Sequence, residues 1–273
     1  ELTDLHKKIV KESNRQEKKK MLDRASELEW QFIEATLKRE DKSESLKKIE
    51  QFKKKNTKPF FLWHLHFADV FQSKGGFDVV IANPPYVSVK EIPENQKKIF
   101  NHVFETGRGR FNLFTLFLEK GINILRPDGV QTFILPEGLY SNVEYQYIRK
   151  YILDKTTILY VNLFSSRVFD AAVDTSIISI NNHRKINSTF PVIRDLAKTT
   201  TTFSQELFND LPFNIFTVNL DRKSREIAFK VIKGLYKNLG QILEIQQGII
   251  YSGQTKEKVF AEKPINSSYK KCL

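Results

Sequence analysis

Four consecutive residues have types suited to chemistry on a nitrogen atom: Asn83, Pro84, Pro85 and Tyr86. The amide oxygen of Asn83 and a backbone carbonyl can together accept both hydrogens of an NH2 group, which turns the nitrogen lone pair toward an electrophile. The two prolines donate no backbone hydrogen and fix φ, so these acceptors are rigid. Tyr86 adds a flat face on which a planar base or amide can stack. The competing interpretation is an ordinary proline turn beside a packed tyrosine.

The chain before these residues predicts the element that positions them. Residues 79–81 form an apolar run rich in β-branched side chains, bounded by two glycines upstream and by the prolines downstream. This pattern is typical of a parallel strand that is buried on both faces. In open α/β sheets ligands bind outside the carboxyl ends of the strands. We therefore expect Asn83 to face a site rather than the core.

The tetrapeptide resembles the catalytic motif of gamma-class DNA methyltransferases, which act on N6 of adenine with S-adenosylmethionine as methyl donor. Residues 109–120 resemble the helix that follows the catalytic strand in this family, residues 125–136 its turn and next core strand, and residues 168–180 its last conserved block. These blocks stand in the family's order between about residues 60 and 182. The resemblance implies an α/β fold with a partial Rossmann-like methyltransferase sheet.

The resemblance also implies roles for residues around the substrate base. Adenine would be extruded from the duplex, because N6 cannot be reached inside it. The base would stack between Tyr86 and Phe169, while Asn83 and the Pro84 carbonyl bind N6. A methyl group would then pass to N6 without a general base.

Two further matches concern the cofactor, S-adenosylmethionine. Asp69 matches an acidic residue that accepts a hydrogen bond from the amino group of the cofactor's adenine, and Phe117 matches an aromatic residue that packs on that ring. Phe114 and Phe117 are also spaced as ordinary core residues of a helix, so both interpretations of Phe117 remain open.

Basic residues indicate a polyanionic partner. The formal net charge of +12 favours phosphate backbones through counterion release. Arg108 and Arg110 flank a glycine after the motif, where a loop can bring their guanidinium groups to phosphates, and Lys90 is a further candidate. Alternatively these residues only solubilise a turn. We expect double-stranded DNA as the partner.

The family's glycine-rich cofactor loop is not found before the catalytic strand. In residues 1–76 the only glycines are Gly75 and Gly76, directly before that strand. Such a loop needs glycine because the backbone must approach the cofactor closely. We therefore interpret the chain as a piece of a longer enzyme, inactive alone. Its further partner is the remainder of the same polypeptide, and whether a nuclease is fused there stays open.

Residues 60–71 alternate large apolar side chains with His64 and His66, a pattern that predicts a strand. Two histidines on one face could begin a metal site, but no third ligand follows at a suitable spacing. We predict ordinary surface histidines and no metal.

Composition excludes several other classes of protein. The single cysteine, Cys272, cannot form an internal disulfide, and this fits a reducing, cytoplasmic location. No apolar run approaches the roughly 18 residues that span a bilayer, and no signal-peptide pattern opens the chain. We expect no membrane partner.

Four segments are predicted along the chain. Residues 1–58 are a charged helical segment, because apolar residues recur at helical spacing between charged ones. Residues 59–200 are the C-terminal half of a methyltransferase catalytic domain, and residues 201–238 a helical connector. Residues 239–273 have glycine-punctuated apolar runs, which resemble the truncated start of a C-terminal target-recognition domain.

The favoured function is a site-specific adenine-N6 DNA methyltransferase within a type II restriction-modification enzyme. Two alternatives stay open. Protein glutamine N-methyltransferases carry the same tetrapeptide, because a side-chain amide offers the same NH2 geometry, but they lack a recognition domain and the block around Phe169. A non-catalytic DNA-binding piece of a restriction system fits the missing glycine loop.

Overall fold

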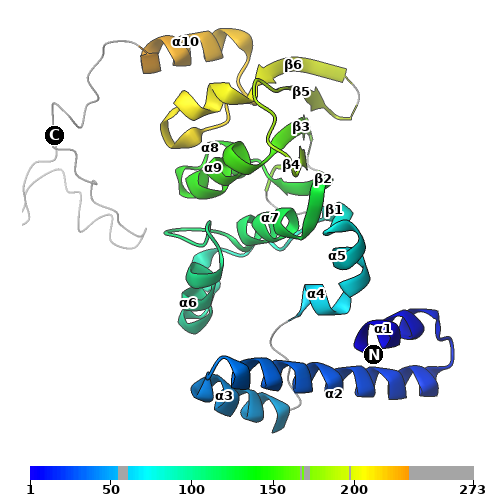
Figure 1. Ribbon diagram of the computed structural model, residues 1–273. Coiled ribbons are helices and arrows are strands. Elements are labelled where there is room, and N and C mark those ends of the chain that lie inside the picture. The colour runs from blue at the N-terminus through cyan, green and yellow to red at the C-terminus, as the bar shows by residue number, and fades with distance from the viewer. Residues whose placement is uncertain (55–60, 167, 169–172, 197, 234–273) are drawn as a thin grey trace, which may run out of the picture. The chain divides into compact units, whose positions relative to one another are not determined.

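The computed structural model describes residues 1–54, 61–166, 168, 173–196 and 198–233. Two compact units are present, residues 1–220 and residues 221–273. The α-helices of the first unit are α1 (Leu2–Lys11), α2 (Arg15–Arg39), α3 (Ser43–Lys54), α4 (Trp63–His66), α5 (Ala68–Lys74), α6 (Glu94–Val103), α7 (Leu113–Ile124), α8 (Gly138–Ser141) and α9 (Gln146–Lys155) (Figure 1). Its strands are β1 (Phe77–Ala82), β2 (Leu125–Pro136), β3 (Thr157–Leu163), β4 (Thr175–Asn181), β5 (Thr189–Arg194) and β6 (Lys198–Ser204). Four short 3-10 helices are η1 (Val89–Glu91), η2 (Val143–Tyr145), η3 (Gln205–Asp210) and η4 (Pro212–Asn214).

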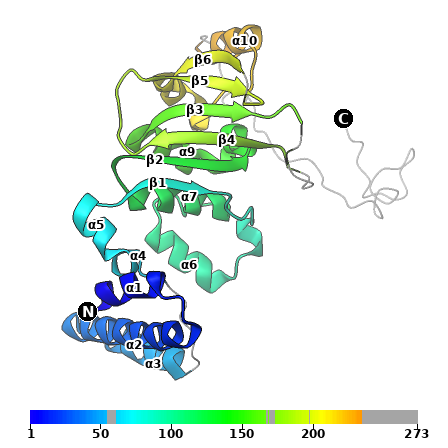
Figure 2. The same ribbon diagram turned by 90° about the vertical axis from the view of Figure 1, so that its right-hand side faces the viewer.

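The strands form one mixed sheet in the order β1-β2-β4-β3-β5-β6 (Figure 2). β1 is parallel to β2 and β3 is parallel to β5, whereas the β2–β4, β3–β4 and β5–β6 pairs are antiparallel. α7 packs on β2, α9 packs on β3, and the two helices pack on one another. This arrangement confirms the predicted α/β class with a mixed sheet.

The core lies between the inner strands and the helices α7 to α9. Its side chains are fully buried, and they include Phe114, Leu118, Leu135, Leu139, Ile152 and Val161. The charged side chain of Arg149 is buried as well. Arg149 of α9 donates hydrogen bonds to the carbonyl oxygens of Leu139 and Asn142, each at 2.7 Å, and to those of Phe213 and Asn214, each at 3.0 Å. Burial lowers the pKa of Arg149 to about 10.

Helices α1 to α3 confirm that the N-terminal segment is helical. Asn14 caps α2, since its side-chain oxygen accepts hydrogen bonds from the backbone N–H groups of Gln16 at 2.9 Å and Glu17 at 3.3 Å. This cap satisfies two donors that have no partner within the helix, and so fixes where α2 begins.

The strand predicted over residues 60–71 is wrong, because residues 63–66 and 68–74 are helical. Trp63, Phe67 and Phe71 recur every four residues, and all three place their rings 5.1 to 6.0 Å from the ring of Phe77 at the start of β1. Apolar and polar side chains alternate over residues 63–67, so this part of the sequence satisfies the strand and the helix pattern together. Packing against Phe77 selects the helix.

Gly76 joins α5 to β1 at a point where two segments of backbone nearly touch. Its φ is +154°, and a Cβ atom at this position would lie 2.5 Å from the backbone nitrogen of Arg126 and 2.6 Å from the carbonyl carbon of Leu125. Such a separation is too short for any side chain. Glycine is therefore required where β1 begins beside β2.

The C-terminal part departs from the predicted helical connector of residues 201–238. The connector begins with the end of β6, followed by η3 and η4. α10 (Arg222–Lys233), in the second unit, is capped by Asp221, whose carboxylate accepts the backbone N–H of Ser224 at 2.9 Å. The predicted recognition segment, residues 239–273, lies outside the described residues, and the other predicted boundaries stay predictions.

Among the helices that the structure describes, none is both long enough and apolar enough to cross a lipid bilayer.

Candidate active site

β1 ends immediately before Asn83 and is parallel to β2, as predicted, but it is not buried on both faces. Val79 is 56% exposed and Ile81 is 76% exposed. Val79 and Ile81 project from the same face of β1, and the described residues leave this face largely uncovered. The apolar run that predicted a strand buried on both faces is therefore exposed on one of them.

The four motif residues follow the carboxyl end of β1. Pro84 is buried, whereas Asn83 and Pro85 are exposed. Among the described residues the side-chain amide of Asn83 has no hydrogen-bond partner, so its oxygen is available to a ligand. Buried Pro84 fixes the chain on one side of this amide. The arrangement is that of a rigid acceptor open to solvent.

Tyr86 is held in one orientation. Its hydroxyl group donates a hydrogen bond to the carbonyl oxygen of Ile134 in β2 at 3.1 Å. Its ring meets the ring of Phe114 edge-on, with the centroids 6.2 Å apart and an interplanar angle of 84°. Burial raises the pKa of the Tyr86 phenol, so the group stays neutral at physiological pH. The ring of Tyr86 is therefore held in a fixed orientation, in which a planar group can stack on it.

The loop after the motif is anchored to the start of α7. The backbone N–H of Val89 donates to the carbonyl of Phe111 at 3.0 Å, and that of Leu113 donates to the carbonyl of Val87 at 2.9 Å. Asn112 caps α7 by accepting the backbone N–H of Phe114 at 3.3 Å. The motif and α7 therefore lie together, although about 25 residues separate them along the chain.

A cavity of about 380 Å³ lies against β1. Its volume is within the range of small-molecule pockets. Phe114 and Phe117 differ in their environment. Phe114 is fully buried in the core, whereas Phe117 is 46% exposed and lines the cavity. The rest of the lining is almost entirely apolar and includes Val80, Ile81, Ala82, Phe100, Leu113 and Phe133. The cavity can accept a flat apolar or aromatic group beside Phe117.

Asp69, the other predicted cofactor residue, does not line this cavity. It is on α5, where its carboxylate forms an ion pair with Lys7 of α1 at 2.8 Å. The structure therefore does not bring the two predicted cofactor residues together. Phe169, the predicted second stacking residue, lies outside the described residues.

The predicted DNA-contacting residues lie on the surface. Arg108 and Lys90 are exposed. Arg110 forms an ion pair with Glu144 at 3.0 Å, and its side chain is 67% exposed. Gly109, between the arginines, has a φ of +62° that favours glycine. These residues leave their cationic groups accessible to solvent.

Two acidic residues near the site, Glu119 and Glu137, were not predicted from the sequence. Glu119 of α7 is 2% exposed and accepts hydrogen bonds from the backbone N–H groups of Glu105 and Thr106, each at 2.9 Å, so it holds the loop that carries Arg108. Glu137 follows the carboxyl end of β2. Burial, then the nearby charge of Asp174, raises the pKa of Glu137. Glu119 could have been noticed in the sequence, because it is a charged residue within the mostly apolar segment 113–124.

Comparison with known proteins gives related sequences that extend well beyond this chain. The Methanocaldococcus jannaschii protein RM.MjaORFECS2P is 28% identical over 179 residues, which cover 65% of this chain and 14% of the relative. The type II restriction enzyme and methyltransferase RM.Eco57I of Escherichia coli is 25% identical over 127 residues, covering 45% of this chain and 13% of the relative. The chain thus matches about a seventh of the length of these relatives.

A solved structure and a family model complete the comparison. The methyltransferase subunit of a type I restriction-modification system from Streptococcus thermophilus matches 58% of this chain and 32% of its own, with 24% identity and a TM-score of 0.36. The family described as Eco57I restriction-modification methylase matches residues 3–169, which is more than half of the chain. The chain belongs to the Eco57I restriction-modification methylase family.

Proposed function

We propose that the protein containing this chain is a site-specific DNA methyltransferase that transfers a methyl group to N6 of adenine, as part of a type II restriction-modification enzyme. The observation that carries this proposal is the amide of Asn83, which is exposed and open to a ligand at the carboxyl end of β1, next to the immobilised ring of Tyr86. Membership in the family supports the same activity.

In this proposal the motif binds and orients the amino group. The Asn83 side-chain oxygen and the Pro84 carbonyl accept the two N6 hydrogens, which directs the nitrogen lone pair away from them. Tyr86 stacks on one face of the base, and Phe169 is proposed for the other. As the methyl–sulfur bond breaks and the methyl–N6 bond forms, N6 would gain positive charge, which the two oxygens would stabilise, and N6 would then release one proton to solvent. No general base is needed, because the proton becomes acidic only after the transfer.

The residues around the cavity fit S-adenosylmethionine, which supplies an electrophilic methyl group when bound. Phe117 offers an aromatic face, and Val80 and Ala82 offer apolar walls, to the purine ring of this molecule. Asp69 does not line this cavity and is paired with Lys7, so its predicted contact with the purine amino group stays a prediction.

The proposed partners are double-stranded DNA and further parts of the same polypeptide. Arg108, Arg110 and Lys90 would neutralise phosphates, and each lost phosphate contact would reduce the slope of log affinity against log salt by about 1. β1 is the outermost strand of the described sheet, and its outer edge favours pairing with another strand. We propose that a further segment of the polypeptide pairs there.

The test uses the longer protein that contains this chain, with plasmid DNA and tritiated S-adenosylmethionine. Methyl transfer is counted, and the product is identified as N6-methyldeoxyadenosine by mass spectrometry. Asn83→Ala is expected to reduce the rate by about 100- to 1,000-fold, the range for removal of one preorganised polar group. The thermal midpoint should stay unchanged, because the Asn83 side chain is exposed.

The matched control is Asn95→Ala, which removes an exposed asparagine side chain from α6 and should leave the rate unchanged. A rate for Asn83→Ala within a few-fold of the parent would contradict the proposal. So would methylation of cytosine in place of adenine, or of a glutamine-containing peptide in place of DNA.

A further inference from the structure

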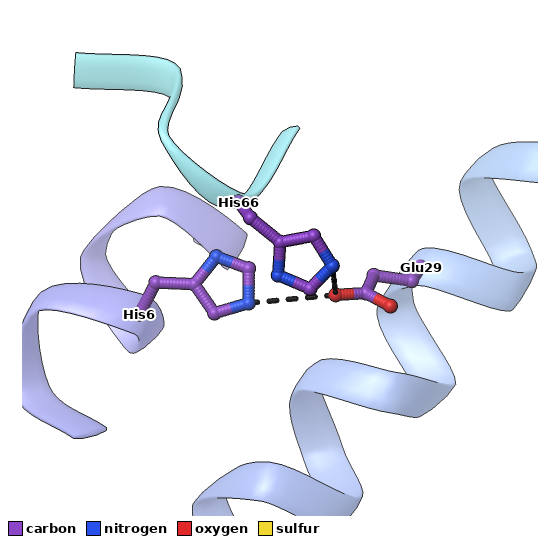
Figure 3. Close-up of side chains that lie close together, drawn as sticks. All are labelled: His6, Glu29 and His66. Atoms are coloured by element: carbon purple, nitrogen blue, oxygen red, sulfur yellow. Dashed lines mark ion pairs between the residues drawn. The ribbon is translucent and has the colours of Figure 1, made fainter. Parts of the chain in front are cut away.

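Three side chains that are far apart in the sequence meet outside the candidate active site. They are His6 of α1, Glu29 of α2 and His66 of α4 (Figure 3). The Nε2 atoms of both histidines point to the same carboxylate oxygen, Oε1 of Glu29, at 3.5 Å from His6 and 3.1 Å from His66. We propose that this cluster, the His6–Glu29–His66 cluster, binds a divalent transition metal ion of the zinc type.

The spacing of the donor atoms fits such an ion. Zinc binds imidazole nitrogen and carboxylate oxygen at about 2.1 Å, which separates neighbouring tetrahedral ligand atoms by about 3.4 Å. The two nitrogen-to-oxygen distances, 3.1 and 3.5 Å, lie on either side of this value. All three donor atoms lie within 4.8 Å of one another, so small side-chain rotations bring them onto one ion.

Burial favours a metal over a solvent-exposed ion pair. Glu29 is 2% exposed, and the side chains of His6 and His66 are 16% and 22% exposed. A bound dication would lie directly against the buried carboxylate of Glu29, and imidazoles bind metal ions in their neutral form. Phe61 stacks on His66 with the centroids 4.2 Å apart, and the two imidazoles stack at 4.8 Å, so the rings are already oriented.

The types of the three ligands indicate which metal ion would bind, and a neighbouring cavity leaves room for a fourth ligand. Two imidazoles and one carboxylate suit zinc and similar ions, whereas magnesium and calcium prefer oxygen ligands throughout. A cavity of about 370 Å³ borders the cluster and can supply a water molecule as the remaining ligand. Because the ligands belong to α1, α2 and α4, the ion would fasten the N-terminal helices to the segment that leads into β1.

The spacing of His64 and His66 in the sequence did not predict this cluster. His64 and His66 are neighbours in sequence, but His64 is exposed and stacks on Phe71. The helical structure of residues 63–66 turns His66 toward Glu29. The other two ligands come from more than 35 residues upstream, so no local spacing predicts the site.

The test uses the full chain without an affinity tag, after dialysis against a chelator. Zn²⁺ is titrated by calorimetry, the thermal midpoint is measured with and without the ion, and Co²⁺ is added separately to record its visible spectrum. We expect one equivalent of Zn²⁺ to bind, a midpoint raised by several degrees, and a Co²⁺ spectrum typical of four-coordination. Mg²⁺ should reproduce none of these effects. This outcome does not depend on methyl transfer.

Variants locate the site. His66→Ala and Glu29→Gln should each weaken Zn²⁺ binding at least tenfold and abolish the midpoint shift, whereas the matched control His64→Ala, two residues away on the same helix, should keep both. Glu29→Gln preserves side-chain size, so it keeps the test valid if His66→Ala fails to fold. The proposal is overturned if the parent chain binds no Zn²⁺ at stoichiometric concentration. It is equally overturned if Zn²⁺ binding survives in Glu29→Gln.

Discussion

Strands β1 and β3 both carry β-branched side chains, but they differ in how deeply these side chains are buried. β1 carries β-branched side chains that are largely exposed, and its carboxyl end leads to an open amide. β3 carries the fully buried Val161 and lies under α9, where Arg149 satisfies four backbone carbonyls. Stability is therefore concentrated around β3 and α9, and the groups suited to chemistry lie at β1. Four predictions test this division.

Arg149→Met should give the largest loss of stability. The substitution removes the donor to the buried carbonyl oxygen of Leu139 and to the part-buried carbonyl oxygens of Phe213 and Asn214, so a loss of about 3 kcal/mol is expected, whereas the carbonyl of Asn142 keeps the backbone N–H of Tyr145. Urea unfolding measures it. Lys150→Met, one residue later and 55% exposed, is the control and should change stability little. Equal losses in both variants would contradict the role of Arg149.

The same substitution on two strands should have unequal costs. Val161→Thr places a hydroxyl group in a fully buried position of β3 and should cost about 1–3 kcal/mol. Val79→Thr on β1, where the side chain is 56% exposed, should stay within about 0.5 kcal/mol. Paired urea titrations compare the two. If Val79→Thr were as costly as Val161→Thr, β1 would be covered in solution and the comparison would fail.

Tyr86→Phe should separate the hydroxyl from the ring. Loss of the hydrogen bond to Ile134 should reduce stability by about 1 kcal/mol, while the remaining ring keeps methyl transfer within a few-fold of the parent. Tyr151→Phe on α9, which removes a 2.7 Å hydrogen bond to Asn123 of α7, is the control for stability. A hundredfold loss of transfer in Tyr86→Phe would assign the phenol a chemical role.

Asp78→Asn should have the smallest effect, a slight loss of stability above pH 4 that disappears in acid. Hydrogen bonds from Lys74, then from Arg126, hold the pKa of Asp78 down to about 2. Because this folded-state pKa lies below the unfolded value of about 3.9, the stabilisation is present above pH 4 and is lost as the pH falls toward 2. Thermal midpoints measured from pH 2 to pH 6 should therefore vary less in Asp78→Asn. An unchanged pH profile would show that this exposed network contributes nothing.

The sequence predicted what depends on local pattern and failed where distant segments decide. The run at residues 79–81 predicts a strand, and Asn83 follows it as expected, but the exposure of Val79 depends on which segments cover that face of β1. Residues 63–74 satisfy two periodicities, and only contact with Phe77 selects the helix. Ile134 as the partner of Tyr86 could not be foreseen either, since it depends on the register between β1 and β2.

The close approach at Gly76 has a consequence for where Asn83 emerges from the sheet. β1 is short, with Ala82 opposite Phe133, so its starting point also determines its last residue. A bulkier residue at position 76 would have to push the strand along or away from its neighbour. Because side chains alternate between faces, a slip of one position would send the Asn83 amide to the opposite side. The absence of a side chain at Gly76 thus fixes the position of a group seven residues further along the chain.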